Sequence, residues 1–348
     1  MSSQSSDGFS VAVVVPVYNV SKYLPECLDS LLKQTHRNFT VFCVDDGSTD
    51  GSGDILDAYA AKDSRILALH KSNGGVSSAR NFALDLIEQS SFDGICFVDS
   101  DDFVTPNFLQ HYVETAISEN ADYVVCGWDA FDRDGILKAK RSSIPPHPQK
   151  VIDNNEAFEH FIRRGSWVNR KSKSFSLFLC NIFFSTKTIK GLRFSTAQKT
   201  AEDQDYRMRA MATINRGVVT SDSTYMYRIR NSSLSHHNND FSDDLRYAMR
   251  LLDRINEFPE RGKATVEFLA LKTWWGYVCH SFSEQRFQEN KDLLNSAYQR
   301  FSSHQFQSDV LKEFRLKLRL FALGEWALHL YMRLRKTKKL HSSSNPFP

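Results

Sequence analysis

The sequence predicts an α/β protein with a doubly wound, mostly parallel sheet and a C-terminal helical extension. Three short apolar runs, residues 11–15, 39–44 and 95–98, each end in polar residues. Runs of this length and composition are typical of buried strands. Helical patterns follow the first two runs, and strand–helix alternation with short connections indicates a parallel sheet covered by helices.

The spacing of apolar residues predicts each helix in turn. The first should begin after Ser21, a candidate N-cap, because Leu24, Leu28 and Leu31 share one helical face. Further helices are expected near residues 55–60, 76–87 and 108–117, and a further strand at 123–127. From about residue 241 onward the pattern becomes helical and rich in aromatic side chains.

Composition excludes several classes of protein. The net charge of +3 over 348 residues is too small to indicate a nucleic-acid partner. The six cysteines are scattered without zinc-ligand spacing, and those at positions 27, 43, 96 and 126 lie in apolar surroundings, which is typical of buried thiols in a reducing compartment. No basic segment precedes the first apolar run, and no stretch approaches the ~20 apolar residues of a membrane span. We therefore expect a cytoplasmic protein.

Acidic residues gather where the third apolar run ends, in Asp99-Ser100-Asp101-Asp102. The carboxyl edge of an open α/β sheet is where ligands usually bind. Carboxylates this close repel one another unless a cation lies among them. Mg²⁺ or Mn²⁺ accepts carboxylate oxygens and keeps positions open for phosphate. The alternative for this tetrapeptide is a solvated acidic turn.

The other two strand ends also carry polar groups. The first ends in Pro16-Val17-Tyr18-Asn19, and the second in Asp45-Asp46-Gly47-Ser48-Thr49-Asp50. The segment Asn73-Gly74-Gly75-Val76-Ser77-Ser78-Ala79-Arg80-Asn81 then begins a predicted helix, and helix starts attract anions. With the acidic tetrapeptide, these segments make four motifs in a fixed order.

Together the four motifs resemble the family 2 glycosyltransferases of bacterial polysaccharide biosynthesis, which have the GT-A fold. Glu202-Asp203 is similar to the acidic pair on the acceptor side of that family. The resemblance covers roughly residues 10–235. It implies an inverting, metal-dependent hexosyl- or N-acetylhexosaminyl-transferase that moves a sugar from a nucleotide-diphosphate donor, with a UDP-sugar favoured. The acceptor would be a hydroxyl of a glycan or lipid-linked glycan.

The resemblance also implies roles for the donor-side residues. Asp101 would be the leading ligand of Mg²⁺ or Mn²⁺, Asp99 would hold the ribose or the ion, and Asp102 would orient either group, although these roles can be exchanged. Tyr18 would contact the base, Asp46 would accept from the imide N–H of the base, and Asp45 would hold the ribose or the loop. The remaining donor-binding candidates are Pro16, Asn19, Asn73, Arg80 and Ser100, with Arg80 reaching the base or the diphosphate.

The alternatives for these donor-side residues are structural. Tyr18 can simply pack, Asp45 and Asp46 can build an Asx turn, and Arg80 can be an exposed helical arginine. On the acceptor side, Asp203 is the candidate general base. Glu202 or Asp205 would hold the acceptor or act as the base in place of Asp203. Carboxylates at a helix start are also expected from the helix dipole alone.

A loop that follows Tyr225-Met226-Tyr227 resembles one that closes over the donor in related enzymes. In it, Arg230 is a candidate for contact with the diphosphate, and His236 and His237 are weaker candidates. The other functions considered are a nucleotidyltransferase, which lacks its usual glycine-rich basic loop here, and a non-catalytic nucleotide-sugar-binding scaffold subunit.

Four parts are expected along the chain. Residues 1–10 should be disordered, 11–127 should bind the nucleotide sugar, and 128–240 should bind the acceptor. Residues 241–348 should form a helical region with a basic tail. Its Trp274, Trp275 and the segment 312–348, which is dense in leucine, aromatic and basic residues, suit the cytoplasmic face of an anionic membrane. The alternative is a helix packed on the protein with a solvated tail.

Overall fold

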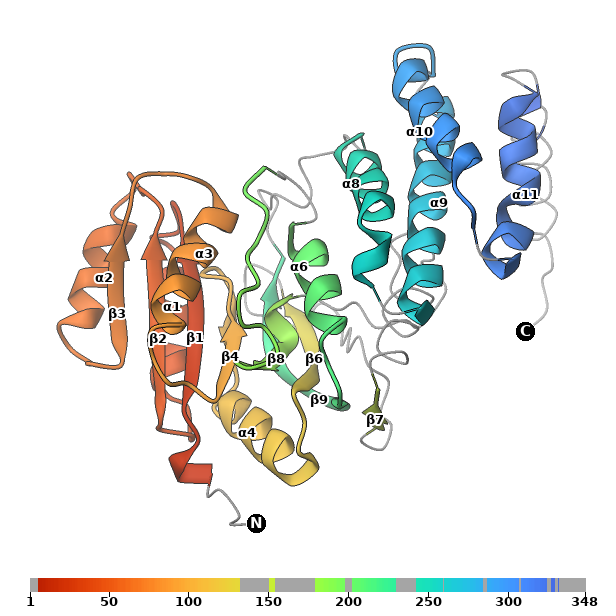
Figure 1. The fold of residues 1–348 in the computed structure, drawn as a ribbon. Coiled ribbons are helices and arrows are strands. Elements are labelled where there is room, and N and C mark those ends of the chain that lie inside the picture. The colour runs from red at the N-terminus through yellow and green to blue at the C-terminus, as the bar shows by residue number, and fades with distance from the viewer. Residues whose placement is uncertain are drawn as a thin grey trace, which may run out of the picture. The chain divides into compact units, whose positions relative to one another are not determined.

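The computed structural model describes residues 6–131, 150–153, 179–197, 202–229, 242–258, 260–283, 287–306, 308–323, 327–328 and 331 (Figure 1). The chain divides into two compact units, residues 1–238 and residues 239–348. The first is an α/β unit and the second is helical. Across the described ranges, no helix combines the length and the apolar character that crossing a membrane requires.

A single mixed sheet organises the described part of the first unit, with nine strands in the order β3-β2-β1-β4-β8-β6-β9-β5 and with β7 paired to β9. The strands are β1 (Val11–Val17), β2 (Phe39–Asp45), β3 (Ile66–His70), β4 (Gly94–Phe97), β5 (Phe103–Val104), β6 (Tyr123–Phe131), β7 (Lys150–Ile152), β8 (Ile182–Ser185) and β9 (Gly217–Arg228). Strands β1 to β4 are mutually parallel, as is β6 with β9, whereas β8 runs antiparallel to β4 and β6.

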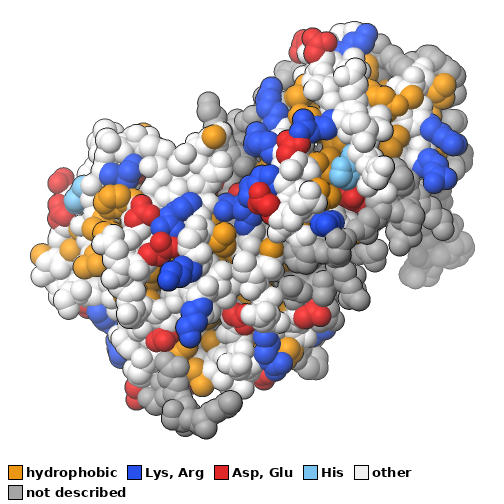
Figure 2. Space-filling model, in the orientation of Figure 1, with side chains coloured by type: hydrophobic (Ala, Val, Ile, Leu, Met, Phe, Trp, Pro, Cys, Tyr) orange, Lys and Arg blue, Asp and Glu red, His pale blue; other side chains and the backbone are white. Residues whose placement is uncertain are grey.

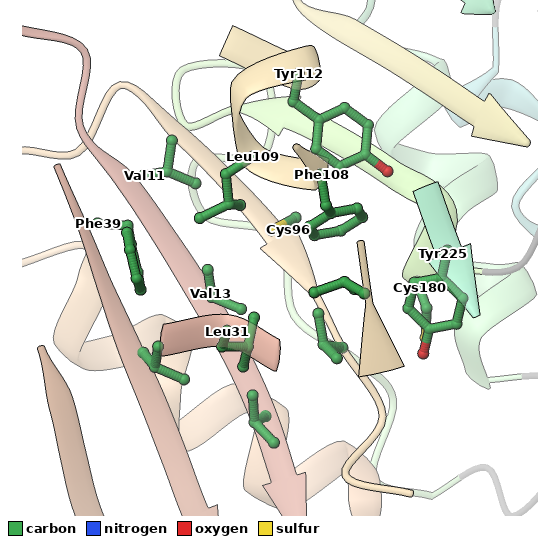
Figure 3. Packing of buried hydrophobic residues seen from close by; sticks show 14 of the residues in the cluster. Val11, Val13, Leu31, Phe39, Cys96, Phe108, Leu109, Tyr112, Cys180 and Tyr225 are labelled. Carbon is green, nitrogen blue, oxygen red and sulfur yellow. The ribbon is translucent and has the colours of Figure 1, made fainter. Parts of the chain in front are cut away.

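Helices cover both faces of this sheet. They are α1 (Leu24–Leu32), α2 (Ser52–Ala60), α3 (Val76–Ile87), α4 (Phe108–Glu119) and α6 (Glu202–Met211). Side chains of α1 and α4, including Leu31 and Tyr112, join the buried cluster around Val13 of β1 and Cys96 of β4 (Figure 3). Phe97 points the other way, because successive side chains of a strand alternate, and its ring lies 5.8 Å from that of Tyr206 in α6.

The register of the parallel strands brings the polar motifs to one edge. Val17 pairs with Asp45 and Asp45 with His70, so β1, β2 and β3 end side by side. Strand β4 lies on the other side of β1, and Val14 pairs with Phe97 shortly before the acidic turn. The chain order reverses between β1 and β4, which is where open α/β sheets bind ligands.

The prediction that residues 1–10 are disordered is wrong for residues 6–10. Ser6–Gly8 form a 3₁₀ turn, Phe9 is buried, and its ring lies 6.1 Å from the ring of Phe183 in β8. The backbone N–H of Ser10 donates to Asp93 Oδ2 at 2.8 Å. The segment is ordered because one aromatic side chain completes the core next to β1.

Ser21 is not the N-cap of α1. The helix begins at Leu24 with Tyr23 in the cap position, and Pro25 follows at its start, where its missing N–H costs nothing. The backbone N–H of Ser21 instead donates to Asp50 Oδ2 at 2.9 Å. This bond ties the end of β1 to the acidic loop that follows β2.

The second unit is built from α8 (Ser242–Asp253), α9 (Glu260–Ser283), α10 (Lys291–Ser303) and α11 (Ser308–Ala322). Trp274 of α9 is fully buried, and its ring lies 5.8 Å from that of Phe301 and 5.1 Å from that of Phe321. Trp275 is also buried and contacts Tyr331. Both tryptophans therefore belong to the core of this unit and do not face outward as a membrane-binding surface would require.

Candidate active site

The acidic turn after β4 is fixed from the side by strand β9. Asp102 is buried, and its carboxylate accepts from Tyr225 Oη at 2.6 Å and from the backbone N–H of Arg228 at 2.7 Å. The Tyr225 hydroxyl also accepts from the backbone N–H of Asp99 at 3.2 Å. Burial, with Asp101 and Asp99 nearby, raises the pKa of Asp102 well above its usual range. Asp102 thus anchors the turn.

Arg228 holds the same turn through its side chain. Its Nε donates to the backbone carbonyl of Asp101 at 2.8 Å, and its guanidinium pairs with Glu26 of α1. The guanidinium also lies 5.1 Å from the ring centroid of Tyr23 and 4.5 Å from that of Phe131. The positioning roles of Tyr225 and Arg228 were not predicted, because it is the pairing of β9 with β5 and β6 that brings these distant residues to the turn.

Arg80 joins the acidic turn to helix α6. It is 5% exposed, and its two terminal nitrogens donate to Asp99 Oδ1 at 3.2 Å and to Glu202 Oε1 at 3.1 Å. Burial lowers the pKa of Arg80, but Asp99 and Glu202 raise it by more, so the net shift is upward. The structure thus contradicts the reading of Arg80 as an exposed helical arginine.

The two acids at the start of α6 differ in their surroundings. Glu202 is the more enclosed, and its pKa is raised because burial and Asp203 outweigh the nearby guanidinium of Arg80. Asp203 has a side chain 29% exposed, and Arg207 of the same helix lies 3.6 Å from its Oδ2. Its Oδ1 accepts from the backbone N–H of Gln204 at 2.8 Å. Asp205 is buried and paired with Arg209 at 2.6 Å, which leaves Asp203 as the more accessible acid of this group.

The loop after β2 is tied together by its own carboxylates. Asp45 is buried, which raises its pKa, but hydrogen bonds from Ser48 and His70 lower it by more. His70 Nδ1 lies 3.1 Å from Asp45 Oδ2, and its Nε2 lies 2.9 Å from Asp57 Oδ1. Asn19 has a left-handed backbone, with φ of 50°, and its Oδ1 accepts from the backbone N–H of Thr49 at 2.9 Å. Asp45 and Asn19 thus shape the loop.

Asp46 supports the segment that begins α3. Its carboxylate accepts from Lys71 Nζ at 2.5 Å, from the backbone N–H of Gly74 at 3.0 Å and from that of Gly75 at 2.7 Å. Gly75 has φ of 87°, in the region that favours glycine. The sequence analysis did not name Lys71, which follows the short strand β3 that it had also not identified.

The remaining sequence candidates are spread along this edge. Tyr18 is 51% exposed at the end of β1, Asn73 is exposed before α3, and Pro16 is half-buried within β1. Ser100 is buried inside the acidic turn. Arg230, His236 and His237 lie outside the described residues.

The described residues contain no group of three acidic, histidine or cysteine side chains that would hold a metal ion by themselves. The acidic turn still fits a metal that a diphosphate helps to bind, because Mg²⁺ commonly uses one or two carboxylates together with substrate phosphates. Asp99 has a side chain 37% exposed, and Asp101 is half-buried. These are the two carboxylates of the turn that reach the surface.

Charges of both signs are interspersed on the face of the molecule drawn in Figure 2. Among the described residues visible there, no extended patch of one sign dominates, unlike the basic surfaces that bind nucleic-acid backbones.

The chain is similar to known glycosyltransferases. It is 32% identical over 226 residues to Glycosyltransferase GlyA of Streptococcus pneumoniae, covering 65% of this chain and 31% of that protein. It is 31% identical over 242 residues to Glycosyltransferase GlyG of the same organism, covering 67% of this chain and 75% of that protein. The chain thus spans about a third of the length of the first relative.

The fold is also found in a solved structure. Residues 1–349 of TarS from S. aureus, in complex with UDP-GlcNAc, superpose with a TM-score of 0.66 at 23% identity, covering 84% of this chain and 80% of that one. This likeness confirms the predicted GT-A class of α/β fold. The sequence profile described as Glycosyl transferase family 2 matches residues 12–195, more than half of the chain. The protein therefore belongs to glycosyltransferase family 2.

Proposed function

We propose that this protein is a metal-dependent, inverting glycosyltransferase that moves a sugar from a nucleotide-diphosphate donor, favoured to be a UDP-sugar, to a hydroxyl of a glycan or lipid-linked glycan in cell-surface polysaccharide synthesis. One observation carries the proposal. A single buried arginine, Arg80, spans from Asp99 on the donor-side turn to Glu202 on the acceptor-side helix. Family membership and the UDP-GlcNAc complex of TarS support the choice of donor.

On the donor side, we assign the exposed ring of Tyr18 to the base and the carboxylates of Asp99 and Asp101 to the metal and the ribose. Bound Mg²⁺ or Mn²⁺ would neutralise charge that develops on the departing diphosphate. Asp102 keeps both carboxylates in place through Tyr225 and the Arg228 backbone. Arg230 stays a candidate for contact with the diphosphate.

On the acceptor side, we assign Asp203 as the general base that takes the proton of the acceptor hydroxyl. It is the more exposed acid at the start of α6, whereas Glu202 is held by Arg80 and is suited to positioning. In-line displacement by the activated hydroxyl oxygen would break the bond between the sugar and the diphosphate and invert the anomeric carbon. A retained anomeric configuration in the product would reject this single displacement.

We propose a cytoplasmic enzyme that associates peripherally with an anionic membrane through residues 312–348. Five of the six cysteines are buried thiols, which supports a reducing compartment. Leu316 and Leu323 are 61% and 57% exposed, and the exposed Arg315 and Arg319 lie beside them on α11. Leu316→Glu should weaken flotation with anionic vesicles at low salt. Wild-type protein that floats with neither anionic nor neutral vesicles would reject this role.

A donor screen tests the proposed function directly. Purified full-length protein is incubated with UDP-, GDP- and dTDP-sugars and Mg²⁺ or Mn²⁺, and nucleotide release is measured. We expect release with one donor class, its loss in EDTA, and a decrease of several orders of magnitude in Asp101→Asn. Full activity in excess EDTA would remove the metal role. Binding of a donor without any release would favour the scaffold alternative.

A further inference from the structure

Lys71 lies between two candidate donor-binding segments, and the proposed function assigns it no role. It follows the last residue of β3, and its backbone N–H donates to the carbonyl of Asp45 at 3.0 Å. Val17, Asp45 and His70 are paired across β1, β2 and β3, so Tyr18, Asp46 and Lys71 follow one another along the same edge. An exposed ring, a buried carboxylate and a mostly buried ammonium group are thus arranged in a row.

The Asp46 carboxylate is held in place by hydrogen bonds from within the protein. A carboxylate has about four acceptor positions. Oδ1 accepts from Lys71 Nζ and from the backbone N–H of Gly74, and Oδ2 accepts from the backbone N–H groups of Gly74 and Gly75. The Asp46 side chain is only 4% exposed. Three donor groups thus hold the carboxylate, and the N–H of Gly74 is shared between its two oxygens.

The ammonium group of Lys71 has more donor hydrogens than the hydrogen bonds described for it. An ammonium group carries three donor hydrogens. Within the described part of the chain, two are used at short distances, by Asp46 Oδ1 at 2.5 Å and by the backbone carbonyl of Ser72 at 2.6 Å. The side chain keeps 17% of its surface exposed. Its third N–H is the donor that this row of groups can offer to a ligand.

Gly74 leaves space beside the Lys71 ammonium group. A side-chain carbon there would lie 3.0 Å from Lys71 Nζ and 2.7 Å from Ser78 Oγ. The absence of a side chain keeps the space around the ammonium open.

We infer that Lys71 selects the donor base by donating a hydrogen bond to its exocyclic carbonyl oxygen, and that Asp46 acts through Lys71 by orienting it. The inference rests on the proposed function. Uracil, thymine and guanine carry such a carbonyl, whereas cytosine and adenine carry an amino group at the corresponding position. An amino group facing an ammonium brings two donors together, so nucleotides of these two bases are disfavoured.

Calorimetric titration of the full-length protein with Mg²⁺ and UDP, CDP, GDP, ADP or inorganic pyrophosphate tests the inference. The wild type should prefer UDP to CDP, or GDP to ADP. Lys71→Met should weaken binding of the preferred nucleotide by about 10–100-fold, as expected for loss of a hydrogen bond from a charged donor. Its CDP or ADP affinity and its pyrophosphate affinity should stay within about threefold. Lys71→Arg, which keeps a charged donor, should retain most of the preference.

Two further variants distinguish loss of the Lys71 hydrogen bond from a folding defect. Lys71→Met leaves a buried carboxylate without its cation, so the double variant Asp46→Asn/Lys71→Met removes both charges and should lose the preference to the same extent. Lys62→Met, an exposed lysine before β3, is the matched control and should bind as the wild type does.

The possible failures can be told apart. An equal loss for all nucleotides and pyrophosphate would place Lys71 on the diphosphate and overturn the inference, as would an unchanged preference. A wild-type protein that binds none of these nucleotides would instead overturn the proposed function.

Discussion

Replacement of Arg80 by methionine tests whether this arginine couples the two halves of the site. The change keeps a long side chain but removes the cation, so Asp99 and Glu202 face each other without their shared partner. Removing one member of a buried ion pair costs about 3–5 kcal/mol. The side chains of Asp99 and Glu202 are 37% and 16% exposed, so water offsets part of this loss and we expect the lower end, about 3 kcal/mol.

For a unit of this size, about 3 kcal/mol corresponds to a decrease in Tm of roughly 6–12 °C. Calorimetric unfolding of the full-length protein measures it. Adding Glu202→Gln to Arg80→Met removes one of the two carboxylates that have lost their partner. The double variant should therefore be destabilised by about 1–2 kcal/mol less than the sum of the two single variants. Arg193→Met, which breaks a surface pair with Asp85 and Glu88, is the control and should be additive with Glu202→Gln. Additive effects of the Arg80 and Glu202 changes would refute the coupling.

Two further predictions concern the supports of the site. Tyr225→Phe removes a donor to buried Asp102 and an acceptor of the Asp99 N–H, so the free energy of unfolding should fall by about 1–3 kcal/mol. Tyr123→Phe should be nearly neutral in the same denaturation assay, because its buried hydroxyl has no hydrogen-bond partner among the described residues. Hydrogen bonds to Asp57 and Asp45 raise the pKa of His70, so its contribution to stability is fully present below about pH 6.5 and is lost as the pH rises through the raised value. Unfolding curves of His70→Asn should lack this decrease above about pH 6.5, and an identical pH dependence in the variant would contradict the assignment.

The polar ends of the first strands could be predicted from the sequence because parallel strands with short connections must end at one edge. Asp99 and Asp45 lie there, as expected, and so does Arg80 at the start of its helix. The strands after β4 could not be predicted in the same way. Strand β8 turns antiparallel and its run Ile182–Ser185 is too short to distinguish from a buried turn by periodicity.

The side chains that position the site were harder to find, since their roles depend on pairings distant in sequence. Tyr225 reaches Asp102 across 123 residues, and Arg80 reaches Glu202 across 122. Spacing along the chain carries no signal for such contacts. Similarly, the C-terminal tryptophans suited a membrane face by composition, and only the packing of Trp274 against Phe301 and Phe321 shows that they form a core.

The proposed function is tested most directly by asking whether Asp203 removes the proton of the acceptor hydroxyl while Glu202, held by Arg80, has only a positioning role. The measurement is the turnover number of Asp203→Asn at saturating donor and acceptor, with the donor Kd determined in parallel and with Glu202→Gln for comparison. Loss of a general base should lower turnover by roughly 10²–10⁴ while the donor Kd stays unchanged. An Asp203→Asn variant that keeps full turnover, with the loss appearing in Glu202→Gln instead, would contradict the account.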